Sequence, residues 1–338
     1  MPRQVRCDLI SLFDINFAGE RFDDDDLASL RAAADNATLE RQLGESRQWV
    51  FDEPRLARFE RYCLPPKGRG AERGASLLLN SEFGVGVFFV WTQHDATADP
   101  LILKDQAWTH ASMALKRLET LLPQQDYDRH FPFISLLLSE TDASDCMGLA
   151  SETVGRLLSG GYAHERLEWL QEIGRRNISR RDYERLLLTW SDTVALYRDD
   201  SDTGLYERSM LRAVQLFETC IAVRRMLLSI GKRADALLPT ISWWHPHPLA
   251  VNRLVEWMRT VERECMEGIA PASVEGQALI EAGYREFGLA RILEQTRPRC
   301  EALERRTAWA KGQGLIVLGV ATYLLDKLKV FNLLPWSK

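Results

Sequence analysis

The chain has 338 residues, of which 46% are hydrophobic and 27% charged, as in ordinary globular proteins. This length exceeds what one compact core usually absorbs, so we expect more than one domain. A net charge of −5 and a pI near 5.8 argue against nucleic acid as the main ligand, because phosphate binding requires a basic surface.

The first 140 residues mix strand and helix patterns. The apolar, β-leaning run 5–17 predicts a buried strand. The aspartates at 23–26 predict a helix start, since carboxylates stabilise the positive end of a helix. Further along the chain, we expect strands at 76–80, 84–92 and 131–138 and an amphipathic helix at 105–122.

Strand patterns then stop, and the spacing of apolar residues becomes helical. Apolar side chains recur every three or four residues in 180–198, 204–238 and 249–267, which predicts three helices. The region 274–334 predicts one very long helix or two stacked helices, with Pro298 as the expected kink.

These patterns predict an α+β fold in three parts. The parts are a small strand-containing N-terminal domain (1–140), a long-helix bundle domain (145–300) and an apolar C-terminal attachment helix (301–338). Long antiparallel helices joined by short links are typical of a bundle or coiled-coil stalk.

The C-terminal helix contains an uncharged run from 312 to 325. At about 1.5 Å per residue the run spans about 21 Å, against about 30 Å for the hydrocarbon of a bilayer. It is a short or tilted membrane span, a helix lying on a membrane or partner, or a buried helix or oligomer seam. Within 309–336, the expected attachment residues are Leu315, Ile316, Leu318, Val320, Leu324, Leu325, Leu328, Phe331 and Trp336.

Three stretches together suggest a family resemblance: Phe-Gly-Val-Gly-Val-Phe-Phe-Val-Trp at 83–91, the predicted helix pair 180–198 and 204–238, and the charged-to-apolar stretch 301–325. Their order resembles that of the CorA-type magnesium channels and, more closely, of the DUF155 proteins. The resemblance implies a strand-bearing N-terminal part, a helical half and a C-terminal membrane helix. The channels carry Gly-Met-Asn after their first membrane helix, whereas this chain has Phe-Asn-Leu-Leu at 331–334, so we expect no magnesium filter.

Two further clusters are candidate contacts. Arg175, Arg176, Arg180 and Arg181 form a basic cluster that suits phosphate or an anionic headgroup. Interleaved acidic residues also predict ordinary charge pairing there. Residues 243–248, Trp-Trp-His-Pro-His-Pro, predict a rigid loop that packs its tryptophans into the bundle or contacts a ligand or partner.

The chain carries no catalytic signature that we can identify. It has no GxSxG, HExxH or phosphate-loop motif and no CxxC ligand pair, so we expect no metal and no cofactor. Six scattered cysteines predict buried thiols in a reducing compartment. A catalytic site assembled from distant segments stays open.

We therefore expect a membrane-associated, oligomeric structural or effector protein with CorA-like architecture. The alternative is a soluble helical subunit of a multiprotein assembly that docks through its C-terminal helix. Both require a second copy of the chain or another protein as partner. The N-terminus shows no secretory signal, so we expect a cytoplasmic location, at the inner face of a membrane if the C-terminal helix contacts lipid.

Overall fold

The computed structural model describes residues 4–17, 24–34, 59–64, 72–94, 100–122, 125–138, 151–159, 166–179, 183–189, 192–198, 203–263 and 274–330. The chain divides into two compact units. The sheet unit comprises Met1–Met226 and Glu264–Ala290, and the helical unit comprises Leu227–Arg263 and Arg291–Lys338. These units differ from the three ranges predicted from the sequence, because strands on both sides of 140–145 belong to one sheet.

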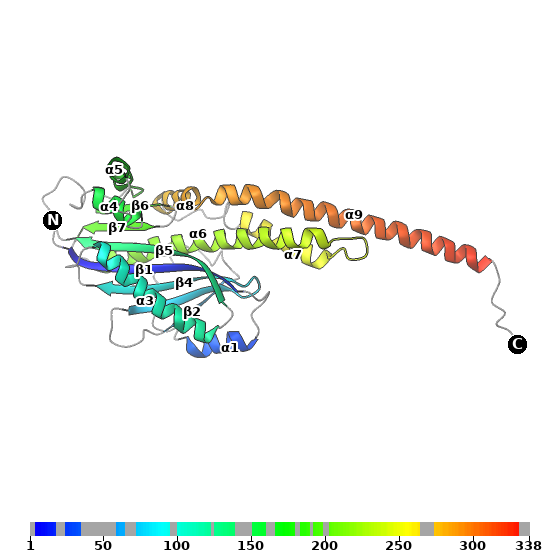
Figure 1. The fold of residues 1–338 in the computed structure, drawn as a ribbon, viewed down its shortest axis with the longest axis horizontal. Coiled ribbons are helices and arrows are strands. Elements are labelled where there is room, and N and C mark those ends of the chain that lie inside the picture. The colour runs from blue at the N-terminus through cyan, green and yellow to red at the C-terminus, as the bar shows by residue number, and fades with distance from the viewer. Residues whose placement is uncertain are drawn as a thin grey trace. The chain divides into compact units, whose positions relative to one another are not determined.

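Seven described strands form the sheet: β1 (Gln4–Phe17), β2 (Glu60–Leu64), β3 (Glu72–Asn80), β4 (Val85–His94), β5 (Gln125–Leu138), β6 (Glu184–Leu188) and β7 (Thr193–Arg198). Their order is β2-β3-β4-β1-β5-β7-β6 (Figure 1). β1 lies in the middle and pairs antiparallel with β4 and β5, while β7 pairs parallel with β5. The first strand of the sequence is therefore the centre of the sheet.

The described helices are α1 (Asp24–Ala33), α3 (Pro100–Leu121), α4 (Ser151–Leu158), α5 (Leu167–Arg175), α6 (Thr203–Leu237), the short 3-10 helix η1 (Leu238–Thr240), α7 (Pro248–Thr260), α8 (Val274–Glu286) and α9 (Leu289–Val330). α6 begins in the sheet unit and ends in the helical unit. The α+β class is confirmed, as are the strand at 5–17 and the helices at 105–122 and 204–238.

The helix predicted over 180–198 is wrong, because this segment forms β6 and β7. Both strands are buried along nearly their whole length, so their apolar residues do not alternate with polar ones. A strand buried on both faces reads as a continuous apolar run, which helical spacing also fits. Of the two predicted helices that supported the family resemblance, 180–198 is therefore not a helix, and 204–238 is α6.

The region predicted as one or two helices over 274–334 contains two, α8 and α9. They are separated at Phe287 and Gly288, not at Pro298, which lies inside α9. Gly288 has a φ of 64°, a left-handed conformation that glycine adopts readily. The amide of Gly288 donates to the carbonyl of Arg285 at 3.2 Å, so α8 ends in a glycine cap.

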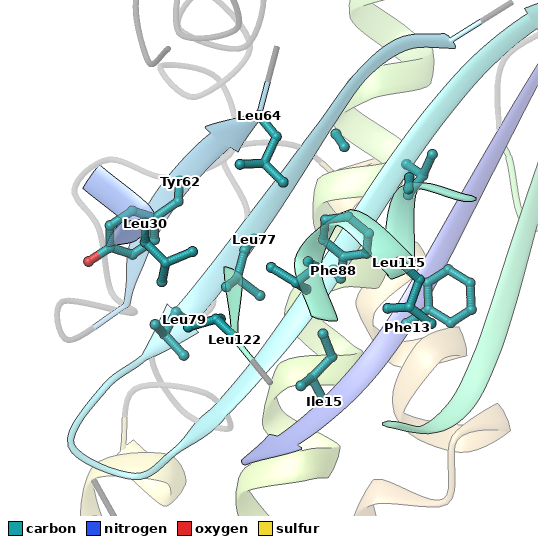
Figure 2. Close-up of a cluster of buried hydrophobic side chains, with 14 of the residues drawn as sticks. Phe13, Ile15, Leu30, Tyr62, Leu64, Leu77, Leu79, Phe88, Leu115 and Leu122 are labelled. Atoms are coloured by element: carbon teal, nitrogen blue, oxygen red, sulfur yellow. The ribbon is translucent and has the colours of Figure 1, made fainter. Parts of the chain in front are cut away.

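Alternate side chains of β1 point to opposite faces of the sheet. Phe13 and Ile15 belong to a buried cluster under α1 and α3 (Figure 2), and Cys7 and Leu9 belong to a second cluster with residues of α4. α1, α3 and α4 therefore cover one face. The first cluster also contains Leu30, Tyr62, Leu64, Leu77, Leu79, Phe88, Val90, Leu115, Leu118 and Leu122.

α6 covers the opposite face of the sheet. Its Phe217 lies against Phe133 of β5, with 5.8 Å between the ring centroids. α8 packs beside it, so closely that a β-carbon on Gly283 would lie 2.7 Å from the sulfur of Cys220. The sheet is the middle of three layers, which explains why its central strands are buried on both faces.

The contact between α4 and α5 depends on Gly155. A β-carbon there would lie 2.1 Å from the carbonyl oxygen of Leu170, a backbone atom that cannot rotate away. We expect Gly155→Ala to lower the free energy of unfolding by about 1–3 kcal/mol, an overpacking cost, although alanine has the better helix propensity. Urea unfolding followed by circular dichroism measures the change.

Gly312→Ala is the matched control for Gly155→Ala. Gly312 also lies in a helix, but nothing is within 4 Å of where its β-carbon would be. This variant should be neutral or gain up to about 1 kcal/mol from propensity. An equal loss of stability in both variants would contradict the close packing of α4 on α5.

Four described cysteines are buried free thiols: Cys7, Cys63, Cys220 and Cys300. The prediction of buried thiols is confirmed for these four, while Cys146 and Cys265 lie outside the described residues. Burial raises the pKa of the Cys7 thiol, with the Asp8 carboxylate adding to the shift. Burial and nearby glutamates raise the pKa of Cys300 to about 11.

These thiols should resist alkylation in the folded protein. Only the thiolate reacts, and a pKa of about 11 leaves roughly a thousandth of Cys300 ionised at about pH 8. Mass spectrometry after a short iodoacetamide pulse should find the four cysteines unmodified in native protein and fully modified in urea. Rapid native modification of Cys7 or Cys220 would show that the layers over the sheet open easily.

Candidate functional site

The end of α9 is an apolar surface that no described residue covers. Every residue from 315 to 325 is exposed. The exposed fractions reach 70% for Leu315, 64% for Leu318 and 62% for Leu325. The other large apolar residues of the run, exposed between 39% and 61%, are Ile316, Val317, Val320, Tyr323 and Leu324.

This surface surrounds the helix. Successive residues of an α-helix are rotated by about 100°, so Leu315, Ile316, Val317 and Leu318 point in four different directions. A helix that docks by one face carries a single apolar stripe, whereas a helix that is apolar all round is surrounded by apolar material. The pattern therefore matches a lipid environment better than a one-sided docking surface.

α9 is the described helix that is long and apolar enough to cross a membrane by length and composition. Its most apolar window has a mean hydropathy of 1.2 and is 6% buried. Of the predicted attachment residues, Leu328 also belongs to α9, and Phe331 and Trp336 lie outside the described residues. The low burial distinguishes this segment from the core helix of a soluble protein.

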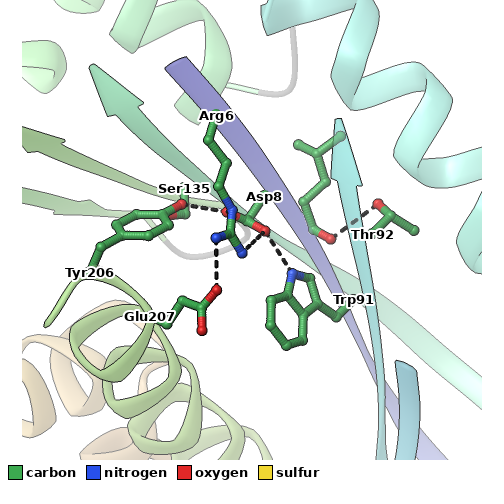
Figure 3. Close-up of polar contacts among 8 residues, drawn as sticks. Arg6, Asp8, Trp91, Thr92, Ser135, Tyr206 and Glu207 are labelled. Atoms are coloured by element: carbon green, nitrogen blue, oxygen red, sulfur yellow. Dashed lines mark hydrogen bonds and ion pairs between the residues drawn. The ribbon is translucent and has the colours of Figure 1, made fainter. Parts of the chain in front are cut away.

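A second candidate, buried between β1 and α6, is a polar network around Asp8 (Figure 3). The Asp8 side chain is fully buried and pairs with Arg6 at 2.8 Å. The indole of Trp91 donates to Asp8 Oδ1 at 2.8 Å, and the hydroxyl of Tyr206 donates to Oδ2 at 2.6 Å. Arg6 also donates to Glu207 of α6 at 2.7 Å.

The network has the character of a structural clamp. Burial raises the pKa of Tyr206 well above its usual value, and the Asp8 carboxylate raises it further, so the phenol stays protonated and donates. Burial lowers the pKa of Arg6, but Asp8 and Glu207 outweigh it and the net shift is upward. Both oxygens of the carboxylate accept hydrogen bonds, which fits a role in holding α6 on the sheet.

Two more ion pairs join α6 to the same face. Glu218 pairs with Arg61 of β2, which also donates to Ser76 Oγ at 2.8 Å. Arg224 donates to Asp14 of β1 at 2.8 Å. Burial raises the pKa of Asp14, opposed by neighbouring arginines. With Glu207 on Arg6, α6 thus meets the sheet at three charge pairs along its length.

A signal for this clamp was present in the sequence. Asp8 and Asp14 lie among the apolar residues of the predicted buried strand, and a buried carboxylate requires a partner. The sequence did not identify those partners, because Tyr206 and Arg224 lie about 200 residues further along the chain. Among the described residues, no group of three or more His, Cys, Asp or Glu could hold a metal ion.

The predicted arginine cluster is described in part. Arg176 is exposed and donates to Glu172 at 2.9 Å, the ordinary charge pairing that the sequence also allowed. Arg175 ends α5, while Arg180 and Arg181 lie outside the described residues. Anion binding by this cluster stays a prediction.

Comparison with known protein families, with curated proteins and with solved structures finds no match to this chain.

Removing the Tyr206 hydroxyl should weaken the clamp. In Tyr206→Phe the buried Asp8 carboxylate loses one donor, so we expect a loss of about 1.5–3 kcal/mol in unfolding free energy, as for other hydrogen bonds to charged groups. Tyr62→Phe is the matched control, because Tyr62 donates to Glu60, whose side chain is 60% exposed and can bind water instead. Equal losses in the two variants, measured by urea unfolding, would contradict the clamp.

Proposed function

We propose that this protein is a membrane-associated structural or effector protein, attached to a bilayer by the end of α9. The observation that carries the proposal is the run 315–325, exposed throughout and apolar on every side. Leaving one leucine or isoleucine side chain in water costs about 1.5–3 kcal/mol relative to burying it. A lipid environment removes that cost for the whole run.

The length of α9 is compatible with insertion. The uncharged run spans about 21 Å, but the helix from Trp309 to Val330 is about 33 Å long. Lys311 precedes the run and Lys327 follows it, and lysines near the ends of a span can extend their ammonium groups to the interface. Trp309, 56% exposed, suits the boundary between lipid and water.

The CorA-like architecture stays part of this proposal, without a magnesium filter. A single span cannot by itself enclose a pore, so conduction would require several copies. The proposed homo-oligomer would place the α9 helices of those copies together in the bilayer. The particle mass of the detergent-solubilised protein, compared with that of one chain, tests the proposed homo-oligomer separately from membrane attachment.

A charge in the middle of the run should abolish attachment. Leu318→Lys adds a central lysine, which costs about 2.5–3.5 kcal/mol on insertion scales. After expression of the full chain and alkaline carbonate extraction, we expect the unmodified protein in the membrane pellet and Leu318→Lys in the supernatant. Carbonate strips proteins held by charge alone, so retention reports insertion.

Gln295→Lys is the control for Leu318→Lys. It adds the same charge at an exposed position of α9 outside the apolar run, so it should stay in the pellet. Unmodified protein that is fully soluble without detergent would reject the proposal. Recovery of that soluble protein in a defined complex would favour the alternative, a subunit that docks through this helix.

A further inference from the structure

The loop between η1 and α7 is rigid and lies within the helical unit. Ser242 and His245 exchange two backbone hydrogen bonds of 3.1 Å. His247 has a φ of 43°, a left-handed conformation unusual for a residue with a side chain. Pro246 and Pro248 fix their own φ angles. We call residues 241–249 the Trp loop.

The Trp loop presents apolar side chains to its surroundings. Trp244 is 70% exposed and Leu249 is 83% exposed, while Trp243 is half-buried. The rings of the two tryptophans lie against one another, with 3.4 Å between their centroids. The prediction that both tryptophans pack into the bundle is therefore wrong for Trp244, which the rigid loop holds outward.

The Trp loop lies beside the start of the apolar run of α9. Arg306 Nε donates to the carbonyl of Ile241 at 3.2 Å. A β-carbon on Gly314 would lie 3.6 Å from the carbonyl oxygen of Trp243. These contacts place the loop at the turn of α9 where the charges end and the exposed apolar side chains begin.

α7 leads from the Trp loop away from the apolar run. Arg259 of α7 donates to Glu304 at 2.9 Å, and Glu262, two residues after the end of α7, accepts from Arg297 at 2.8 Å. From Arg259 to Glu262, the partners on α9 thus lie progressively earlier in the sequence. The order along α9 is the ion pairs of α7, the Trp loop, then the run 315–325.

We infer that the Trp loop is a second membrane-contacting element, which inserts Trp244 and Leu249 at the headgroup level and fixes the depth of α9. Tryptophan prefers this zone, because its ring is apolar and its N–H needs a polar partner. The contacts to Ile241 and Trp243 make the loop continuous with the proposed span. The inference rests on the proposed function.

Photocrosslinking to lipid tests the Trp loop directly. Benzoylphenylalanine is placed singly at positions 244, 249, 256 and 318 of the full chain, reconstituted in vesicles of equimolar phosphatidylcholine and phosphatidylglycerol. Position 256 is the matched control: Glu256 is exposed and lies two turns after Leu249 on the same face of α7, about 10 Å along its axis. Lipid adducts are quantified by mass spectrometry.

We expect lipid adducts at 244, 249 and 318, each at least about tenfold above those at 256. Adducts at 318, with 244 and 249 no higher than 256, would overturn the Trp loop inference and leave the membrane span intact. No adducts at any position would reject the span and the inference together. Adducts of 244 and 249 to protein in place of lipid would also overturn the inference.

Discussion

The removal of apolar side chains from water is the constraint on which the whole architecture depends. For the described strands of the sheet this constraint is met, because α1, α3 and α4 cover one face of the sheet and α6 and α8 cover the other. The described part of the helical unit does not meet it over residues 315–325. An apolar surface around a whole helix implies an environment that is itself apolar.

The polar side chains between α6 and the sheet have a different role. Buried ion pairs contribute little net stability, since desolvating both charges offsets their attraction. They are demanding in geometry, however, and two of them, Glu218–Arg61 and Arg224–Asp14, lie along one helix. Glu207, Glu218 and Arg224 must each meet a partner of opposite charge on the sheet, so a shift of α6 by one turn would leave buried charges unpaired.

Local sequence patterns predicted the helices and strands whose character is visible within their own segment of the chain. The run 5–17 and the long α6 were found from spacing alone, whereas β6 and β7 were missed because burial on both faces removed the alternation that identifies a strand. The C-terminal run was recognised from composition. Its exposure on all sides, and the position of the Trp loop beside its start, depend on the tertiary structure, which no local pattern encodes.

Hydrogen–deuterium exchange of the full chain in lipid nanodiscs tests the membrane attachment of α9 most directly. In an exposed helix with no tertiary contacts, backbone amides open and exchange quickly, whereas hydrocarbon excludes the water that exchange requires. We expect the amides of 315–324 to exchange far more slowly in unmodified protein in nanodiscs than the same amides in Leu318→Lys protein recovered without lipid. Equally fast exchange of 315–324 in the two samples would contradict the membrane attachment.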